Sequence, residues 1–399
     1  MSNTKSFTLI ELLIVIGILA ILVAAVVVTL NPAQLLAQAR DSKRQQDLSA
    51  LNQALNTITA LDQSLFMGTS SIVYTSLPDS TTTCANWNLP PLPSGWQYHC
   101  SPTSTLQNTD GTGWIPVNFK TTGVVSLSSL PIDPQNTSST GLYYTYVTGG
   151  SWELDAILES QKYRQDSKMS KQNFPGVVAV GNDLNLSPLF NSTGLVGYWN
   201  FDERSGTIAY DKSGNNNNGT LVNGPIWAQG KVGGALQFNG ANMCVNVGSK
   251  PMFDSLINNF SVIFWGYSNV SQTKRLVSKG YLNQWEFEFR NDNCLAMNYF
   301  DGVSNRFLAN RYCGVPNNQW FFAAFIISEG ALKVYYQGIL VNTTVLPASL
   351  VQTNYGVLVG SRENICPSDG TFNGLIDEVR IYNRALSASE ISALYNATR

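Results

Sequence analysis

Few side chains of this sequence have the types and spacing that a reaction needs. A single histidine, His99, and six cysteines without a CxxC pair exclude Cys2His2 zinc chemistry and disfavour a catalytic triad. One pair of carboxylates, Glu286 and Glu288, falls on the same side of the predicted strand QWEFEFR, and glycoside hydrolysis requires two carboxylates. The same strand also fits a simple alternation with its acidic side in solvent. We therefore expect a protein that is not an enzyme, with a surface glycoside hydrolase as the minor alternative.

A second candidate site is an aspartate near the C-terminus. Asp377 shares a predicted strand face with Leu375, Val379 and Ile381, so its carboxylate points toward the apolar side and needs a partner. The loop DKSGNNNNG supplies Asp211 and several asparagine carbonyls, which are hard oxygen ligands suited to calcium. The residues leave two interpretations open. Either calcium binds here, or Asp377 accepts backbone N–H groups and the asparagine run is a turn.

The cysteines are scattered along the chain behind an apolar N-terminal run, which predicts disulfides in an exported protein. Cys84 and Cys100 bracket a fifteen-residue loop, and a disulfide that closes it would stabilise the fold by roughly 3 kcal/mol. The sequence leaves three pairings open for the other four cysteines. These are Cys244, Cys294, Cys313 and Cys366.

Length and composition limit the remaining possibilities. A chain of 399 residues can build two or three domains, each with its own core. Charged residues make up 13% and the net charge is −2, so we expect no basic face for nucleic acid. The polar share is mostly Asn, Ser, Thr and Gly, which suits turns and β-rich surfaces.

The N-terminal segment KSFTLIELLIVIGILAILVAAVVVTL has a charged residue beside a long apolar run. Residues 12–30 carry no charge and are long enough to cross a bilayer as a helix. Glu11 stands at the edge of this run, where burying a charge costs a few kcal/mol. Two ordinary interpretations fit poorly. An acidic residue is unusual in a secretory signal, and the basic residues that follow the run would keep the large domains of a plain anchor in the cytoplasm.

The stretch SFTLIELLIVIGILAILVAA resembles the class III signal of type IV pilins and type II secretion pseudopilins. The resemblance implies that a prepilin peptidase cuts between Ser6 and Phe7 and methylates the new N-terminus of Phe7. The family usually has glycine where this chain has Ser6. Its usual helix-interrupting proline is replaced by Val28, with Pro32 four residues later, so we expect any kink to be shifted.

Cleavage would give Glu11 a role. In this family the carboxylate pairs with the N-terminal amine of an adjacent subunit and so sets the register of assembly. A buried carboxylate that pairs with a buried ammonium avoids much of the cost of desolvating either group alone. The alternative is that Glu11 reaches the membrane interface, or becomes neutral, and has no role in assembly.

After Pro32 the pattern becomes that of an amphipathic helix. Its apolar positions recur at steps of three and four residues or their sum: Leu48, Leu51, Leu55, Ile58 and Leu65. Together with the apolar run, this predicts one helical spine of about 90 Å. Short runs with turn residues between them then predict a small antiparallel sheet, and the polar stretch that follows predicts a linker.

The C-terminal half reads as an all-β sandwich. FSVIFWGYS and QWFFAAFIIS are apolar on both faces, as strands buried between layers would be. The stretches LVGYWNFDERSGTIAYDKSGNNNNGTL, GKVGGALQFNG and GTFNGLIDEVRIYNRALSASEI resemble the laminin G-like, concanavalin A-like jelly-roll family. Members mostly bind glycans or proteins, often around calcium. By position, the resemblance implies Asp211 and Asp377 as calcium ligands.

These observations predict an α+β protein with a helical spine, a small antiparallel β head and a concanavalin A-like sandwich. The expected boundaries are a leader at 1–6, an assembly helix at 7–66, a head at 67–160, a linker at 161–193 and the sandwich at 194–399.

We expect a pilin-like subunit that inserts in the cytoplasmic membrane and then forms a homo-polymer on the cell surface. Its partners would be prepilin peptidase and a glycan or protein ligand for the sandwich. The alternative is a pseudopilin of a secretion or DNA-uptake system with a cargo-binding C-terminal domain.

Overall fold

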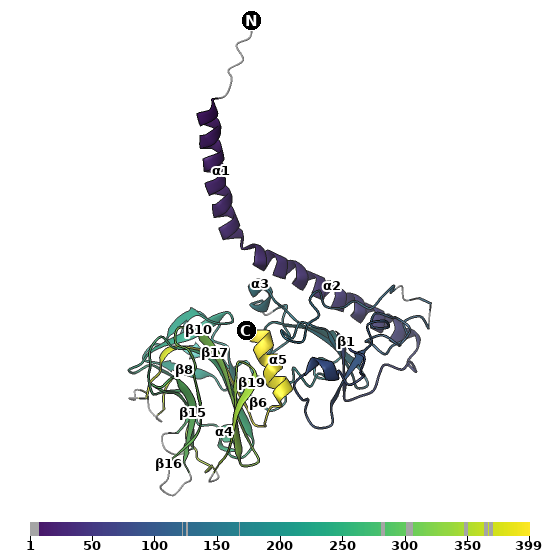
Figure 1. The fold of residues 1–399 in the computed structure, drawn as a ribbon. Coiled ribbons are helices and arrows are strands. Elements are labelled where there is room, and N and C mark those ends of the chain that lie inside the picture. Colours follow the sequence, from purple (N-terminus) through teal and green to yellow (C-terminus); the bar gives the residue numbers. More distant parts are fainter. Residues whose placement is uncertain are drawn as a thin grey trace.

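The computed structural model describes residues 8–121, 123–124, 127–166, 168–280, 284–300, 306–346, 350–362, 366 and 370–399. The predicted cleavage residues Ser6 and Phe7 lie outside this set. A helical stalk leads into two β-rich bodies, with the last helix of the chain between them (Figure 1). We call these bodies the head and the module.

The stalk consists of α1 (Leu9–Leu30) and α2 (Pro32–Leu61). Asn31 separates them in the left-handed conformation, with φ of 40°, and its side chain accepts a hydrogen bond from the Gln34 N–H. Pro32 is the first residue of α2, where its missing N–H is tolerated. The break therefore falls at Pro32, as the sequence indicates, and α1 leaves α2 at an angle (Figure 1).

The buried face of α2 is the predicted one, since Leu48, Leu51, Leu55 and Ile58 are fully buried. They pack on one face of the head sheet, together with Tyr146 and other residues of that face. The helix is shorter than expected: it ends at Leu61, with Asp62 as its cap, so the predicted position Leu65 lies beyond it.

The head sheet has the order β2-β1-β3-β4-β5, and β1 and β2 run parallel within an otherwise antiparallel sheet. This parallel pair differs from the predicted antiparallel sheet, because the connection from β1 to β2, which contains Cys84, crosses over instead of forming a hairpin. The strands are β1 (Ile72–Pro78), β2 (Gln97–Ser101), β3 (Thr145–Thr148), β4 (Trp152–Ile157) and β5 (Val177–Gly181). Short helices η1 (Ala85–Trp87) and α3 (Gln161–Arg164) lie in the connections.

The segment 161–193, expected as a linker, completes this sheet. Its run VVAVG forms β5, which pairs with β4 from Glu153↔Gly181 to Ile157↔Val177. The Glu153 carboxylate accepts hydrogen bonds from the N–H groups of Leu186 and Ser187, both at 2.8 Å. These contacts hold the segment against the head.

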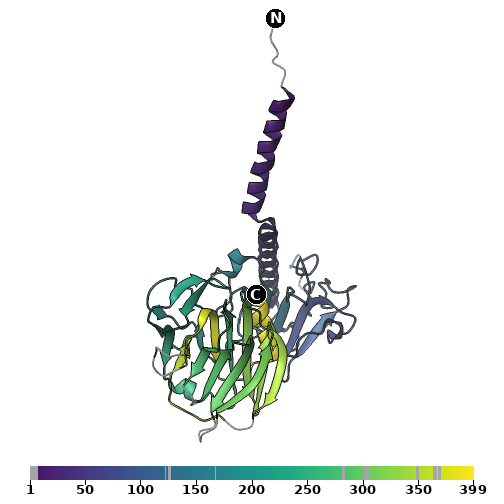
Figure 2. The same cartoon turned by 60° about the vertical axis from the view of Figure 1, so that its left-hand side comes forward.

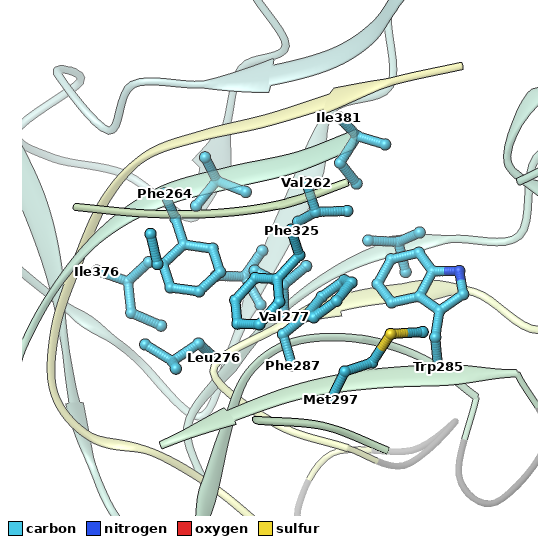
Figure 3. Close-up of a cluster of buried hydrophobic side chains, with 14 of the residues drawn as sticks. Val262, Phe264, Leu276, Val277, Trp285, Phe287, Met297, Phe325, Ile376 and Ile381 are labelled. Atoms are coloured by element: carbon cyan, nitrogen blue, oxygen red, sulfur yellow. The ribbon is translucent and has the colours of Figure 1, made fainter. Parts of the chain in front are cut away.

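The module consists of two eight-stranded sheets with an apolar core between them (Figure 3). The sheet nearer the head, which we call the proximal sheet, has the order β19-β18-β17-β12-β21-β10-β9, with β6 also paired to β21. The other, the distal sheet, has the order β16-β15-β14-β13-β20-β11-β8-β7. Phe264 and Phe325 face Phe287 across the core, and Phe287 and Phe325 stack with centroids 4.4 Å apart.

The strands of the proximal sheet are β6 (Leu195–Trp199), β9 (Ile226–Gln229), β10 (Gly234–Asn239), β12 (Phe260–Tyr267), β17 (Trp320–Ser328), β18 (Ala331–Tyr336), β19 (Ile339–Val345) and β21 (Asn373–Tyr382). Those of the distal sheet are β7 (Ile208–Ala209), β8 (Gly219–Val222), β11 (Cys244–Gly248), β13 (Lys274–Lys279), β14 (Trp285–Phe289), β15 (Cys294–Phe300), β16 (Arg306–Cys313) and β20 (Val357–Val359). A short helix, α4 (Pro251–Asp254), precedes β12, and α5 (Ala388–Thr398) follows β21.

Head and module share a second apolar core. α5 lies between the two bodies (Figures 1 and 2). The outer face of the proximal sheet, including Ile263 and Trp265, joins one buried cluster with Val73 and Val147 of the head and Leu394 of α5. The head sheet is therefore covered by α2 on one face and by α5 and the module on the other.

Candidate functional site

The N-terminal motif forms a capped helix start. Thr8 caps α1 and its hydroxyl accepts a hydrogen bond from the Glu11 N–H at 3.3 Å. In return, Glu11 Oε2 accepts hydrogen bonds from the N–H and the hydroxyl of Thr8, at 2.9 and 2.8 Å. This is a capping box, which fixes the carboxylate at the end of the helix next to the predicted cleavage site.

Apolar side chains of α1 lie outside the folded body. Leu9, for example, is 82% exposed, and residues 9–23 are all exposed. A large exposed apolar surface marks a protein or membrane contact. Among the residues that the structure describes, none of the helices meets the length and apolarity that a membrane span requires.

The six cysteines form three disulfides. Cys84–Cys100 closes the predicted loop of the head. In the module, Cys294–Cys313 joins β15 to β16, and Cys244–Cys366 joins β11 to a residue 122 positions along the chain. Of the three pairings that the sequence leaves open, the structure therefore has Cys244 with Cys366 and Cys294 with Cys313.

The carboxylates of Glu286 and Glu288 are buried, at 2% and 1% exposure, so the predicted solvent-facing side of this strand is wrong. Arg275 lies between them, with Nε 3.0 Å from Glu286 and Nη2 3.4 Å from Glu288. Arg290 donates to Glu288 at 2.5 Å. These ion pairs explain how the two acidic side chains tolerate burial.

Asp211 organises its own loop. Its Oδ1 accepts the N–H groups of Tyr198 and Ser213, both at 2.9 Å, and its Oδ2 accepts the Ser213 hydroxyl at 2.8 Å and the Asn217 N–H at 2.9 Å. Four donors occupy the carboxylate, as in a turn that is held by an aspartate. This arrangement matches the second interpretation of the loop, in which the asparagine run is a turn.

Asp377 fits the role of a calcium ligand better than Asp211 does. It is fully buried, and its Oδ2 accepts the Val232 N–H at 2.9 Å while, within the described residues, Oδ1 has no hydrogen-bond partner. Burial and the nearby charge of Glu378 raise its pKa well above the ordinary value for an aspartate. Such a carboxyl needs either a proton or a cation.

Asp202, which was not predicted as a site residue, contacts the loop of residues 232–234 that Asp377 also contacts. Its Oδ1 accepts the Gly234 N–H at 2.6 Å. Its approach to the backbone is so close that a Cβ on Gly233 would lie 2.0 Å from Oδ1. The two adjacent acidic residues in WNFDERSG, Asp202 and Glu203, were the only signal that the sequence offered. Across the described ranges, no three His, Cys, Asp or Glu side chains form a group that could hold a metal ion.

Comparison with known families finds two matches. Residues 1–27 match the prokaryotic N-terminal methylation motif, and residues 239–392 match the concanavalin A-like lectin/glucanases superfamily. The chain thus joins an N-methylation signal to a concanavalin A-like domain, as the two resemblances in the sequence imply. No curated protein matches the sequence.

Solved structures with some likeness include domain 4 of AbnA, a GH43 extracellular arabinanase from Geobacillus stearothermophilus, in complex with arabinotriose. It is 24% identical over 50% of this chain and 98% of its own, with a TM-score of 0.41. The binding domain of Paraclostridial Mosquitocidal Protein 1 is 16% identical, with 51% of this chain and 52% of that one covered and a TM-score of 0.41. The chain spans about half the length of this toxin domain. Scores of this size support no functional assignment.

Proposed function

We propose that this protein is a pilin-like subunit that polymerises through α1 into a surface filament and displays the module as an adhesive domain. The observation that carries the proposal is the N-methylation motif at residues 1–27, which is typical of pilins and pseudopilins. The exposed apolar side chains of α1 support it, since a helix of this kind needs a bilayer or other helices around it. Before assembly, that surface would lie in the cytoplasmic membrane.

The capping box supports a simple mechanism. Prepilin peptidase would cut between Ser6 and Phe7, leaving a free ammonium on the residue just before the helix cap. Glu11 is held at that same end of the helix by Thr8. In a bundle of such helices, the carboxylate of one subunit would meet the ammonium of the next, and their pairing would offset the cost of burying both.

Two variants of Glu11 separate charge from capping. Glutamine can replace glutamate in a capping box, so Glu11→Gln keeps the helix start and removes the charge. We expect this variant to insert in the membrane and to be cleaved normally, but to form no filaments in the native host, and Glu11→Leu to do the same. Filaments of normal length and number from Glu11→Gln would refute the proposed pairing. If deletion of the gene abolishes secretion or DNA uptake but leaves surface filaments in place, the pseudopilin alternative is favoured.

We also propose that Asp377 binds calcium with Asp202, in place of the expected Asp211. Both carboxylates accept N–H groups from the loop of residues 232–234, and Asp377 keeps one oxygen without a hydrogen bond among the described residues. Calcium at a hundred times its Kd would stabilise the fold by about 2.7 kcal/mol. A calcium titration of the melting temperature tests this: the shift should vanish in Asp377→Asn and Asp202→Asn. No shift in the parent protein at millimolar calcium would exclude a site that matters.

A further inference from the structure

An open groove lies where the head meets the module. One wall is formed by head residues 164–165 and 170–175, and the other by module residues that include Asn200, Glu203 and Lys212. Its volume of about 660 Å³ falls within the range of small-molecule sites, which form preferentially at domain interfaces. Neither the methylation motif nor the match to the concanavalin A-like superfamily accounts for a site with a wall from each domain.

The module wall presents acceptors that the protein leaves without donors. The Glu203 side chain is only 9% exposed, and its Oε1 accepts the Tyr210 N–H at 3.1 Å and pairs with Lys212 at 3.4 Å. Glu203 Oε2 and Asn200 Oδ1 are buried and, within the described residues, have no hydrogen-bond partner. An unsatisfied buried acceptor costs about 1–3 kcal/mol, so a ligand that donates to these oxygens gains affinity.

The head wall presents exposed amides. Gln165 and Gln172 both line the groove, and each amide can donate and accept. Basic and acidic side chains both line the groove: Arg164, Lys171, Arg204, Lys212, Asp202 and Glu203. Lys171 already pairs with Glu153, and Arg164 already donates to the carbonyls of Leu158 and Arg399. Arg204 and Lys212 then stand against Asp202 and Glu203, so the groove favours neither sign of charge. A neutral ligand rich in hydroxyl groups can donate to the acidic oxygens and accept from the amides and ammonium.

The packing between the two domains holds the walls in place. Arg380 of β21 donates to the Asn173 carbonyl of the head and lies over the Tyr198 ring, with its guanidinium carbon 3.8 Å from the centroid. Phe174, beside Asn173, packs in the shared core. The groove therefore exists only while head and module are docked.

We propose that this groove binds a neutral carbohydrate chain. The inference rests on the adhesive role proposed above and specifies the ligand class and the site. It also means that the head takes part in recognition.

The test uses the full chain in detergent on an array of neutral and charged oligosaccharides, followed by calorimetry with the strongest binder. We expect neutral glycans to bind. Glu203→Gln replaces an acceptor by a donor and should weaken binding about tenfold. The double variant Gln165→Ala/Gln172→Ala, which changes only exposed head residues, should weaken it about as much. Gln161→Ala is the matched control, since Gln161 is exposed in the same segment but does not line the groove, and should bind as the parent does.

Each outcome decides the inference. Weaker glycan binding by both Glu203→Gln and the double variant Gln165→Ala/Gln172→Ala, with unchanged melting temperatures, supports it. Binding that is insensitive to all groove variants, or to the head variants alone, overturns the two-domain site and leaves adhesion through another surface intact. Binding of charged glycans only, or of none, overturns the ligand class. Filament formation is decided separately by Glu11→Gln, so failure of one does not imply failure of the other.

Discussion

Arg44 offers the sharpest test of how the stalk is fixed to the head. Its guanidinium is fully buried and donates twice to Asp133, from Nε at 2.6 Å and Nη2 at 2.9 Å. Nη1 also lies 2.8 Å from Asp41 and 2.5 Å from Glu159. Replacing Arg44 by methionine keeps the volume of the stem but leaves these carboxylates without their shared cation. Breaking a buried ion pair in this way costs about 3–5 kcal/mol, so Arg44→Met should lower the free energy of unfolding by at least that much.

The neighbouring lysine is the control. Lys43 is 59% exposed and pairs with Asp47 four residues along the helix. Asp47 is buried but also accepts the Tyr144 hydroxyl at 3.0 Å, so it keeps a partner when Lys43 is replaced, and we expect Lys43→Met to cost about 1 kcal/mol. Guanidinium unfolding followed by tryptophan fluorescence should therefore separate Arg44→Met from Lys43→Met by several kcal/mol. Adding Asp133→Asn to Arg44→Met should recover part of the loss, because one unpaired charge is removed. A loss below about 1 kcal/mol for Arg44→Met would refute the reasoning, since it would mean that the buried carboxylates do not need the guanidinium.

Three further variants test other parts of the structure. Burial opposes ionisation of Glu159, but the charges of Arg40 and Arg44 outweigh it and hold the pKa of this carboxyl below its ordinary value. The stability that the ionised carboxylate contributes is present above that ordinary value and is lost as pH falls through the folded-state pKa. Glu159→Gln should therefore flatten the acid limb of a plot of melting temperature against pH. Gly233→Ala, at φ +64° with a Cβ 2.0 Å from Asp202 Oδ1, should cost clearly more in a denaturant titration than Gly214→Ala, at φ +92° in open space, which should cost about 1–2 kcal/mol. Leu394→Ala in the shared core should cost about 2–5 kcal/mol and leave a single calorimetric transition for head and module, whereas two separate transitions would contradict a common core.

The spacing of apolar residues in the sequence predicted which faces of single helices and strands are buried. Leu48, Leu51 and Leu55 repeat at helical steps, and all three are buried on the head side of α2. The two-sided apolar strands, now β12 and β17, predicted layers on both of their faces. The structure has both, since Phe264 faces the module core and Trp265 faces the head.

The partners across these surfaces were beyond the sequence, because an apolar face does not specify what covers it. Glu286 and Glu288 fitted a solvent-facing pattern, and their burial depends on Arg275 from another strand. Arg44 and Asp133 are 89 positions apart, so no local pattern in the sequence pairs them. Asp133 holds a turn, accepting the Gln135 N–H at 2.8 Å, and it also anchors the stalk.

For the function proposed above, the shared core determines how the module would be carried on a filament. A flexible linker would let the module rotate freely on the filament. Here β5 belongs to the head sheet, α5 lies between the two bodies, and Arg380 of the module reaches the Asn173 carbonyl. Force on a ligand in the groove would therefore pass through a packed apolar core into the head sheet and, on its other face, into α2. Ligand recognition and filament assembly would then depend on one continuous folded body.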